Sequence, residues 1–436
     1  MVPTQRTYGL LIAGGAVATL LTNFSDSPQR LTVALIALAA FDGAVLLAMV
    51  GDGLWGRRQR VRVSRAPLSR LSIGRDNPIQ LHLQGAAAQV LIYDNYPAAF
   101  TGPPLPLRVS LGGQPETLTY TVRPHQRGEY SWGDIAIRQR GPLGLAWGEW
   151  TVAARDTVAV YPDLIALRQL SIRLALQSTG TLRQRRQLGM GTEFSELREY
   201  GFGDDPRLID WKATARRSAP LIRVLEPERE QTLLILLDRG RLMTAQVQGL
   251  SRFDWGLNAA LALALAGIHR GDRVGIGVFD RSLHAWLPAK GGQPHLRTMV
   301  ERLTPIQPVL LESDYLGAIT QVVAQQHRRA LVVVLTDIVD ATASAELLSA
   351  LVRLRPKYLP FCVTLRDPQV DRIAQGTATD AASGYRRAVA LDLQAQRQAA
   401  FHRLKQKGVL VLDAPVDGIG EPLVEAYLRV KVRGRL

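Results

Sequence analysis

Acidic residues recur at the ends of apolar runs in the second half of this chain. Asp238, Asp280, Asp337 and Asp413 close such runs, for example TLLILLD and ALVVVLTD. Carboxylates that converge can bind a hard cation such as Mg²⁺ or act as general acid and base. Asp238 and Asp337 are the best candidates for one shared metal site, although Asp is also a common N-cap and turn residue.

A second charged cluster occupies residues 189–230, directly before the first apolar run. Acidic and basic side chains alternate there, with aromatic residues that a purely solvating segment would lack. The pattern predicts an ion-pair network that fastens this arm to the following domain, or a face that docks a partner, and the two are compatible. The candidate residues are Glu193, Arg198, Glu199, Tyr200, Asp204, Asp205, Asp210, Trp211, Lys212 and Arg216.

The middle of this arm predicts a turn that leads into a helix. Asp205 suits the N-cap and Pro206 the first helical position, and the helix would continue through Trp211 to about Arg216. Residues 221–225 then have the pattern of a strand. If Trp211 is buried, its truncation to Ala would cost about 3–5 kcal/mol of stability.

The elements that must position the strand-end carboxylates begin at residue 231. Short apolar runs alternate there with helical segments, which is typical of parallel strands covered on both faces. The pattern predicts a doubly wound α/β domain, whose ligands lie beyond the carboxyl ends of the strands. We expect strands at 232–238, 273–280, 330–337, 358–365 and 409–413, an antiparallel edge strand at 283–289, and helices at 252–269, 293–304, 312–328, 343–355, 389–407 and 419–431.

The N-terminal region predicts a membrane anchor. Residues 8–24 and 31–50 are apolar runs close to the length of about 20 residues that crosses a bilayer as a helix. Five arginines lie between residues 57 and 65, so the positive-inside rule places the soluble bulk in the cytoplasm. The net charge of +15 suits anionic membrane lipid, and we expect no nucleic-acid binding because much of the remaining basic charge is mixed with acids.

Between the anchor and the arm, short strand-like runs separated by Gly, Pro and Asn predict a small β-sandwich, with Trp132, Trp147 and Trp150 as core bulk. The single cysteine, Cys362, excludes an internal disulfide and lies in a run that predicts a buried strand. The expected domains are a transmembrane hairpin (1–56), a β-rich domain (57–161), a basic helical connector (162–188), the arm (189–230) and the α/β domain (231–436).

The sequence lacks the familiar catalytic patterns. It has no Walker A sequence, no Gly-x-Ser-x-Gly elbow and no His/Cys metal spacing. We therefore expect a protein that is not an enzyme and needs no cofactor. The alternative is a metal-dependent hydrolytic enzyme that uses the strand-end carboxylates.

The strand–helix order resembles von Willebrand factor A-like domains, which often carry an Asp-x-Ser-x-Ser metal motif. Here the motif positions read Asp238-Arg239-Gly240-Arg241-Leu242, so both serines are absent. Ser313 could replace the loop threonine of such domains, and Asp337 stands at the position of their later Asp. The resemblance implies a degenerate site with at most weak Mg²⁺ binding.

The segment GTEFSELREYGFGDDPRLIDWKATARRSAPLIRVLEPERE resembles the signature of the domain-of-unknown-function 58 family. Members are bacterial proteins with two N-terminal spans, a β-rich region and a von Willebrand A-like domain, associated with MoxR-type AAA+ ATPases. The resemblance implies an adaptor or scaffold at the bacterial cytoplasmic (inner) membrane. It would act with such an ATPase, and a possible protein client, in complex remodelling, maturation or envelope stress.

Overall fold

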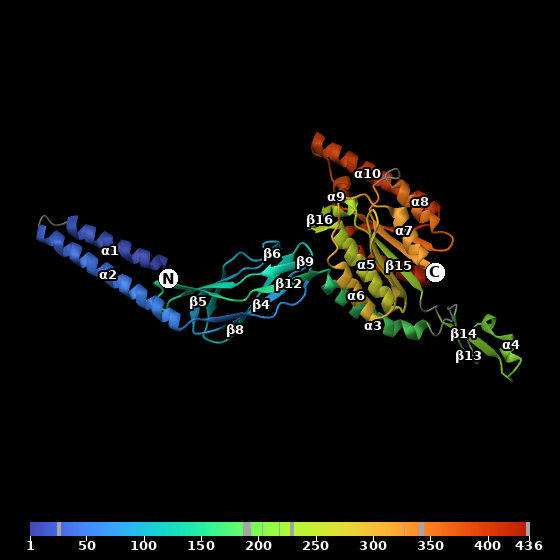
Figure 1. Ribbon diagram of the computed structural model, residues 1–436, viewed down its shortest axis with the longest axis horizontal. Helices are drawn as coiled ribbons and strands as arrows, with labels where there is room; N and C mark the ends of the chain where they lie inside the picture. Colours follow the sequence, from blue (N-terminus) through green and yellow to red (C-terminus); the bar gives the residue numbers. More distant parts are fainter. Residues whose placement is uncertain are drawn as a thin grey trace. The chain divides into compact units, whose positions relative to one another are not determined.

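The protein divides into two compact units, Met1–Tyr161 and Pro162–Leu436. The computed structural model describes residues 1–23, 28–185, 193–202, 204–217, 219–226, 231–326, 328–339 and 344–432. Figure 1 shows the elements of both units in sequence colours.

Two helices open the first unit. α1 (Gln5–Asn23) and α2 (Pro28–Arg58) lie side by side (Figure 1). Their approach is close at Gly14, where a Cβ atom would lie 2.7 Å from the ring of Phe41. Among the described residues, Thr32–Arg58 is a helix long and apolar enough to cross a membrane.

The rest of the first unit is β-rich, as expected, and its strands form three sheets. The five-stranded sheet has the order β1-β11-β10-β5-β7, the four-stranded sheet β2-β4-β8-β6, and the three-stranded sheet β3-β12-β9. The strands are β1 (Val2–Pro3), β2 (Arg62–Arg65), β3 (Leu71–Ser72), β4 (Asn77–Gln84), β5 (Ala88–Asp94), β6 (Phe100–Thr101), β7 (Leu107–Leu111), β8 (Glu116–Pro124), β9 (Gly128–Trp132), β10 (Ile135–Arg140), β11 (Ala146–Val152) and β12 (Asp156–Tyr161).

Alternation along these strands separates a buried face from an exposed one. In β4, every second side chain is buried. Trp132 is buried as predicted, but the prediction that Trp147 and Trp150 are also core residues is wrong. Both are partly exposed: the alternation in β11 buries Ala146 and Gly148 and turns Trp147 to the other face, while Trp150, on the same face as Ala146, is only partly buried.

The second unit contains the predicted parallel sheet. Its six strands have the order β19-β18-β15-β20-β21-β22. All neighbours are parallel except β18 and β19, so the predicted antiparallel edge strand is confirmed. The bounds are β15 (Thr232–Asp238), β18 (Arg273–Phe279), β19 (Leu283–Lys290), β20 (Ala330–Thr336), β21 (Leu359–Arg366) and β22 (Leu410–Pro415).

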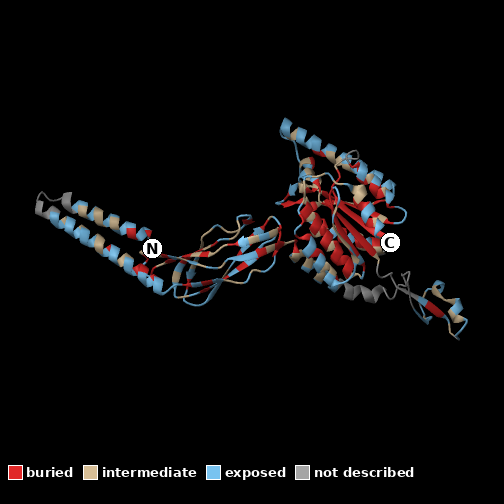
Figure 2. Cartoon of the chain, viewed as in Figure 1, coloured by how far each residue is buried: buried red, intermediate tan, exposed pale blue. Residues whose placement is uncertain are grey.

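Helices cover both faces of this sheet, so the central strands are buried throughout (Figure 2). Leu233 and Leu237 of β15 face α5 (Arg252–His269), while Leu234 and Leu236 join the core formed with α7 (Tyr315–Ala324), α8 (Ala345–Arg353) and α10 (Ala381–Gln406). The predicted helix 252–269 has the bounds of α5, and Ser251 and Asp254 form a complete capping box. Further helices of the second unit are α3 (Leu164–Arg185), α6 (Gln293–Leu303), α9 (Pro368–Gln375) and α11 (Gly420–Val432).

The arm is a strand pair that encloses two short helices. β13 (Glu193–Glu199) pairs antiparallel with β14 (Leu221–Glu226). The prediction of one helix to Arg216 is wrong: η1 (Pro206–Leu208) ends first, and α4 (Trp211–Thr214) begins anew. Ile209 between them is extended and bridges Ile222, and strand pairing of this kind is incompatible with a continuous helix. Gly203 of the predicted turn lies outside the described residues.

Candidate functional site

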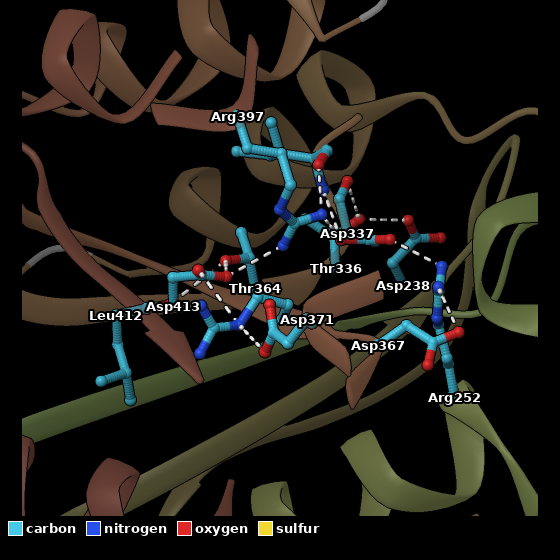
Figure 3. A network of polar contacts seen from close by, with 12 residues as sticks. Asp238, Arg252, Thr336, Asp337, Thr364, Asp367, Asp371, Arg397, Leu412 and Asp413 are labelled. Carbon is cyan, nitrogen blue, oxygen red and sulfur yellow. Dashed lines mark hydrogen bonds and ion pairs between the residues drawn. The ribbon is translucent and has the colours of Figure 1, made fainter. Parts of the chain in front are cut away.

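The carboxyl ends of the parallel strands bring acidic side chains to one edge of the sheet, as the sequence predicts. Asp238 ends β15, Asp337 follows β20 directly, and β15 and β20 are hydrogen-bonded neighbours. Asp413 lies in β22 and Asp280 follows β18. Figure 3 shows that arginine side chains from flanking helices point into the same region.

The Asp238 carboxylate is buried and accepts hydrogen bonds on both oxygens. Oδ1 accepts from Ser313 Oγ at 2.5 Å and from the Gly240 amide at 2.7 Å. Oδ2 accepts from Thr336 Oγ1 at 2.7 Å and from the Tyr315 hydroxyl at 2.9 Å. These four donors use the roughly four lone-pair positions that a carboxylate offers. Ser313 therefore contacts Asp238, as is required if Ser313 replaces the loop threonine of von Willebrand factor A-like domains.

Tyr315 remains a hydrogen-bond donor in this arrangement. Burial raises the pKa of its hydroxyl, and the negative charge of Asp238 raises the same pKa further. A phenol held neutral in this way stabilises the adjacent carboxylate and is a poor general base.

Asp337 is engaged by two arginines rather than left free for a cation. Its Oδ2 accepts from Arg252 Nη1 and its Oδ1 from Arg397 Nη1, both at 2.6 Å. The amide of Ile338 also donates to Oδ1, at 2.9 Å. Asp337 is thus the centre of a buried ion triad (Figure 3).

Arg397 joins this triad to the next strand of the sheet. Its Nη2 donates to Asp413 Oδ1 at 2.9 Å, and Thr364 Oγ1 donates to the same oxygen at 2.8 Å. Burial lowers the pKa of the Arg397 guanidinium, but the charges of Asp337 and Asp413 raise that pKa more, so it lies above its ordinary value. The Arg397 guanidinium therefore stays protonated within the cluster.

Arg239 has a partner of its own. Its Nε donates to Asp280 Oδ2 at 2.8 Å, and both side chains are largely buried. Burial alone would raise the pKa of Asp280. The hydrogen bonds from Arg239 and the Ser282 amide, together with the positive charge of Arg239, lower that pKa by more, so it lies below its ordinary value. Arg241 pairs instead with Glu312 at the surface.

The site as arranged does not fit a divalent cation. Asp238 already accepts four hydrogen bonds, and Asp337 is held by two guanidinium groups. A hard cation needs about six oxygen ligands, several of which water can supply, but it also needs carboxylate lone pairs that are free. Across the described ranges, no group of three or more His, Cys, Asp or Glu side chains is arranged to hold a metal ion.

The arm places its predicted residues in two local ion pairs. Arg198 donates to both oxygens of Asp204, at 2.8 and 2.6 Å, and Asp204 also accepts from the Gly201 amide. Arg223, which the predicted set did not include, donates to Asp210 at 2.7 Å. Asp210 also caps α4 by accepting from the amides of Lys212 and Ala213. These contacts stabilise the arm itself, because each joins one arm residue to another.

The remaining predicted arm residues lie on or near its surface. Asp205 caps η1, Glu199 and Tyr200 are exposed, and Lys212 and Arg216 are exposed on and just after α4. The condition for a large stability loss on truncation of Trp211 is not met, since its side chain is 70% exposed, and Phe202 is fully exposed. The side chain of Glu193 lies outside the described residues.

Sequence reasoning missed the arginines and hydroxyls that complete the strand-end cluster. Arg252 is the first residue of α5, directly after the recognised N-cap, and Arg397 lies within α10. Tyr315 begins α7 and Thr336 ends β20. Of these four residues, only Thr336 could have been identified from the sequence: it directly precedes Asp337 at a strand end, and strand-end residues meet at one edge of a parallel sheet.

Several solved structures are similar to part of this chain. An aerotolerance-related membrane protein from Bacteroides fragilis is 16% identical, with 47% of this chain and 99% of that chain covered and a TM-score of 0.30. BatB from Bacteroides thetaiotaomicron is 15% identical, with 46% and 98% covered and a TM-score of 0.32. The VWA domain of SpRpn10 is 14% identical, with 45% and 95% covered and a TM-score of 0.29.

Similar sequences occur in bacteria. Rv1480 of Mycobacterium tuberculosis and Mb1516 of Mycobacterium bovis are each 25% identical over 242 residues, which cover 54% of this chain and 74% of theirs. YeaD of Bacillus subtilis is 26% identical over 127 residues, which cover 28% of this chain and 31% of YeaD. Residues 196–408 match the family described as "Protein of unknown function DUF58", which confirms the predicted resemblance to that family.

Proposed function

We propose that this chain is a membrane-anchored, non-enzymatic adaptor that docks a MoxR-type AAA+ ATPase through its arm. The observation that carries the docking proposal is the pair of exposed aromatic side chains on the arm, Trp211 and Phe202. Large aromatic residues are enriched at the centres of protein interfaces and supply much of their binding energy. The class of the partner comes from the family resemblance.

The charges of the arm support a preformed docking surface. The Arg198–Asp204 and Arg223–Asp210 pairs hold the segments on either side of the exposed aromatics. A surface already ordered before binding loses less conformational entropy when a partner arrives. Exposed Lys212 and Arg216 beside Trp211 favour a partner face that carries acidic residues.

The strand-end cluster supports a role other than catalysis. Asp238, Asp337 and Asp413 all accept hydrogen bonds from neighbouring side chains. A general base needs a lone pair that can reach substrate, and a metal enzyme needs carboxylates that can bind metal. The cluster is better suited to rigidify the sheet edge.

The anchor in this proposal is a transmembrane hairpin of α1 and α2, followed by a β-sandwich spacer. The soluble bulk would lie in the cytoplasm, because Arg57, Arg58 and further arginines follow the second helix. The hairpin would hold the complex at the inner membrane while ATP turnover by the partner acts on a client protein.

The test is binding of the full chain, in detergent, to the MoxR-type ATPase of the source organism. Loss of a hot-spot side chain costs about 2 kcal/mol, so Trp211→Ala should weaken the affinity about 30-fold. Tyr385→Ala is the matched control, because Tyr385 is a similarly exposed aromatic residue on α10. Its affinity should equal that of the wild type.

Two results would count against the adaptor. A wild-type chain that neither binds the ATPase nor changes its turnover, with or without nucleotide, removes the proposed partner. Mg²⁺-dependent hydrolysis of generic phosphatase or protease substrates, lost in Asp238→Ala, would favour the metal-dependent hydrolase instead.

A further inference from the structure

A buried carboxylate fastens the end of α2 to the β-rich part of the first unit. Asp52 is almost completely buried near the end of this helix. Its Oδ1 accepts from the Leu143 amide at 2.7 Å, and its Oδ2 accepts from the amides of Leu145 and Ala146 at 2.7 and 3.0 Å. All three donors lie in or beside the loop that joins β10 and β11. Hydrogen bonds from amides to a carboxylate are among the stronger kinds.

Further contacts make this connection a packed joint. Thr4, before α1, donates its hydroxyl to the Gly144 carbonyl at 2.7 Å and its amide to the Leu145 carbonyl at 2.9 Å. The short strand β1 pairs with β11 directly beside these bonds. A Cβ atom on Gly141 would overlap the Asp52 carboxylate, so only glycine allows the loop to approach this closely.

The position of Asp52 along α2 sets the depth of this joint in a membrane. The apolar run begins near residue 31, and a helix rises about 30 Å over the next 20 residues, the thickness of a bilayer's hydrocarbon core. Asp52 therefore falls at the hydrocarbon boundary. Exposed Trp55 follows, and then Arg57 and Arg58. Trp at the interface and Arg at the headgroups is the order expected on the cytoplasmic side.

Leu143 lies at this depth and faces outward. Its amide is bonded to Asp52, while its side chain is 60% exposed at the tip of the β10–β11 loop. An exposed leucine gains free energy when it inserts at the boundary between headgroups and acyl chains. Leu54 is exposed at a similar depth, on the side of α2 away from Asp52.

We infer that the β10–β11 loop, residues 141–145, inserts into the interfacial layer of an anionic bilayer beside the end of α2. The partner is the lipid surface itself: Leu143, Leu54 and Trp55 contact the acyl boundary, and Arg57 and Arg58 contact anionic headgroups. Because Asp52 bonds the loop, the β-rich part is then seated on the membrane in one orientation. This inference rests on the membrane anchor of the proposed function.

The test uses a fluorescent label on the loop of the full chain, reconstituted into vesicles of phosphatidylethanolamine and phosphatidylglycerol. Leu143→Cys can be labelled selectively with an environment-sensitive dye, because Cys362 is buried and burial raises the pKa of its thiol to about 12. Arg155→Cys is the control, since Arg155 is exposed just beyond β11, at the opposite end of the β10–β11 pair.

We expect dye at position 143 to emit at shorter wavelength and to be quenched several-fold more by lipids spin-labelled near the headgroup than dye at position 155. Asp52→Asn should reduce that quenching, because an amide cannot accept hydrogen bonds on both of its terminal atoms. Flotation of the vesicles at alkaline pH reports the anchor separately.

Each result is decisive. Protein that floats but shows equal quenching at both positions overturns the loop inference and leaves the anchor intact. Protein that does not float overturns both. Unchanged quenching in Asp52→Asn overturns the role of Asp52 in setting the depth of the loop.

Discussion

The hydroxyl of Ser313 occupies the space that a side chain on residue 240 would need. A Cβ atom on Gly240 would lie 2.8 Å from the Leu311 carbonyl and closer still to Ser313 Oγ. Ser313 in turn donates to Asp238 at 2.5 Å. The hydroxyl beside Asp238 thus comes from a segment far along the chain, and the position of the first motif serine is closed to any side chain.

Gly240→Ser should therefore destabilise the α/β domain and should not create a metal site. Overpacking of this kind costs about 1–3 kcal/mol, which pulse proteolysis in urea would measure on the full chain. Ser313→Gly in the same molecule should recover part of the loss, because it removes the nearest clash. Full stability of the single variant, with new Mg²⁺ affinity, would show that the loop moves aside.

Divalent cations should leave the stability of the wild-type protein unchanged. Binding to the native state raises stability by RT ln(1 + [L]/Kd), so a site that fills at millimolar Mg²⁺ would shift the melting temperature. We expect no shift with Mg²⁺, Mn²⁺ or Ca²⁺, because Asp238 and Asp337 are already satisfied by protein donors. A saturable shift that Asp238→Ala abolishes would contradict this expectation.

Arg397→Ala should be strongly destabilising. The side chain is 11% exposed and neutralises both Asp337 and Asp413. Removal of one partner from a buried ion cluster typically costs about 3–5 kcal/mol, since it leaves a buried charge uncompensated. Arg241→Ala is the control, because the Arg241–Glu312 pair is at the surface, where such pairs contribute about 0–1 kcal/mol. Equal effects of the two variants would refute the central role of Arg397.

The Arg239–Asp280 pair should stabilise the protein less as the pH falls. The pKa of Asp280 is lowered in the folded state, so its contribution is complete above the unfolded pKa of about 3.9 and is lost as the pH falls through the lower folded value. Hydrogen exchange of the β15 and β18 amides would give the unfolding free energy. The difference between wild type and Asp280→Asn should shrink in acid, and a difference independent of pH would be the contrary result.

Trp211→Ala should change the stability of the arm little. A substitution at an exposed surface position is usually within about 0.5 kcal/mol. Ile222→Ala is the contrasting variant, because Ile222 is buried in β14, and loss of a buried Ile side chain costs about 2–5 kcal/mol. Limited proteolysis of the arm would separate the two, and rapid cleavage in Trp211→Ala alone would restore a structural role for that residue.

Most of the α/β domain could be predicted from the sequence because its elements are local patterns. Every expected strand of the sheet is present, and the bounds of α5 match the prediction. Some element ends differ from the prediction: α10 begins at Ala381, earlier than predicted, because Asp380 and Ser383 form a capping box there. The short α9 was missed, although Asp367 and Pro368 provide an N-cap and a first helical residue.

The candidate sites were predicted only in part. The location of the strand-end carboxylates could be predicted, since all parallel strands present their carboxyl ends to one edge of the sheet. The partners of these carboxylates could not be predicted, because they come from distant parts of the chain: Arg397 contacts Asp337 from 60 residues further along. In the arm, the alternation of charges could not show whether Trp211 is buried.

The sequence alone determined the order of elements, the apolar N-terminal run and the placement of Asp238 and Asp337 at the ends of strands, because these depend on local periodicity. Only the tertiary structure decided what each carboxylate binds. Hydrogen bonds and ion pairs depend on where helices such as α5 and α10 pack across the sheet, and that packing brings together residues that no local pattern connects.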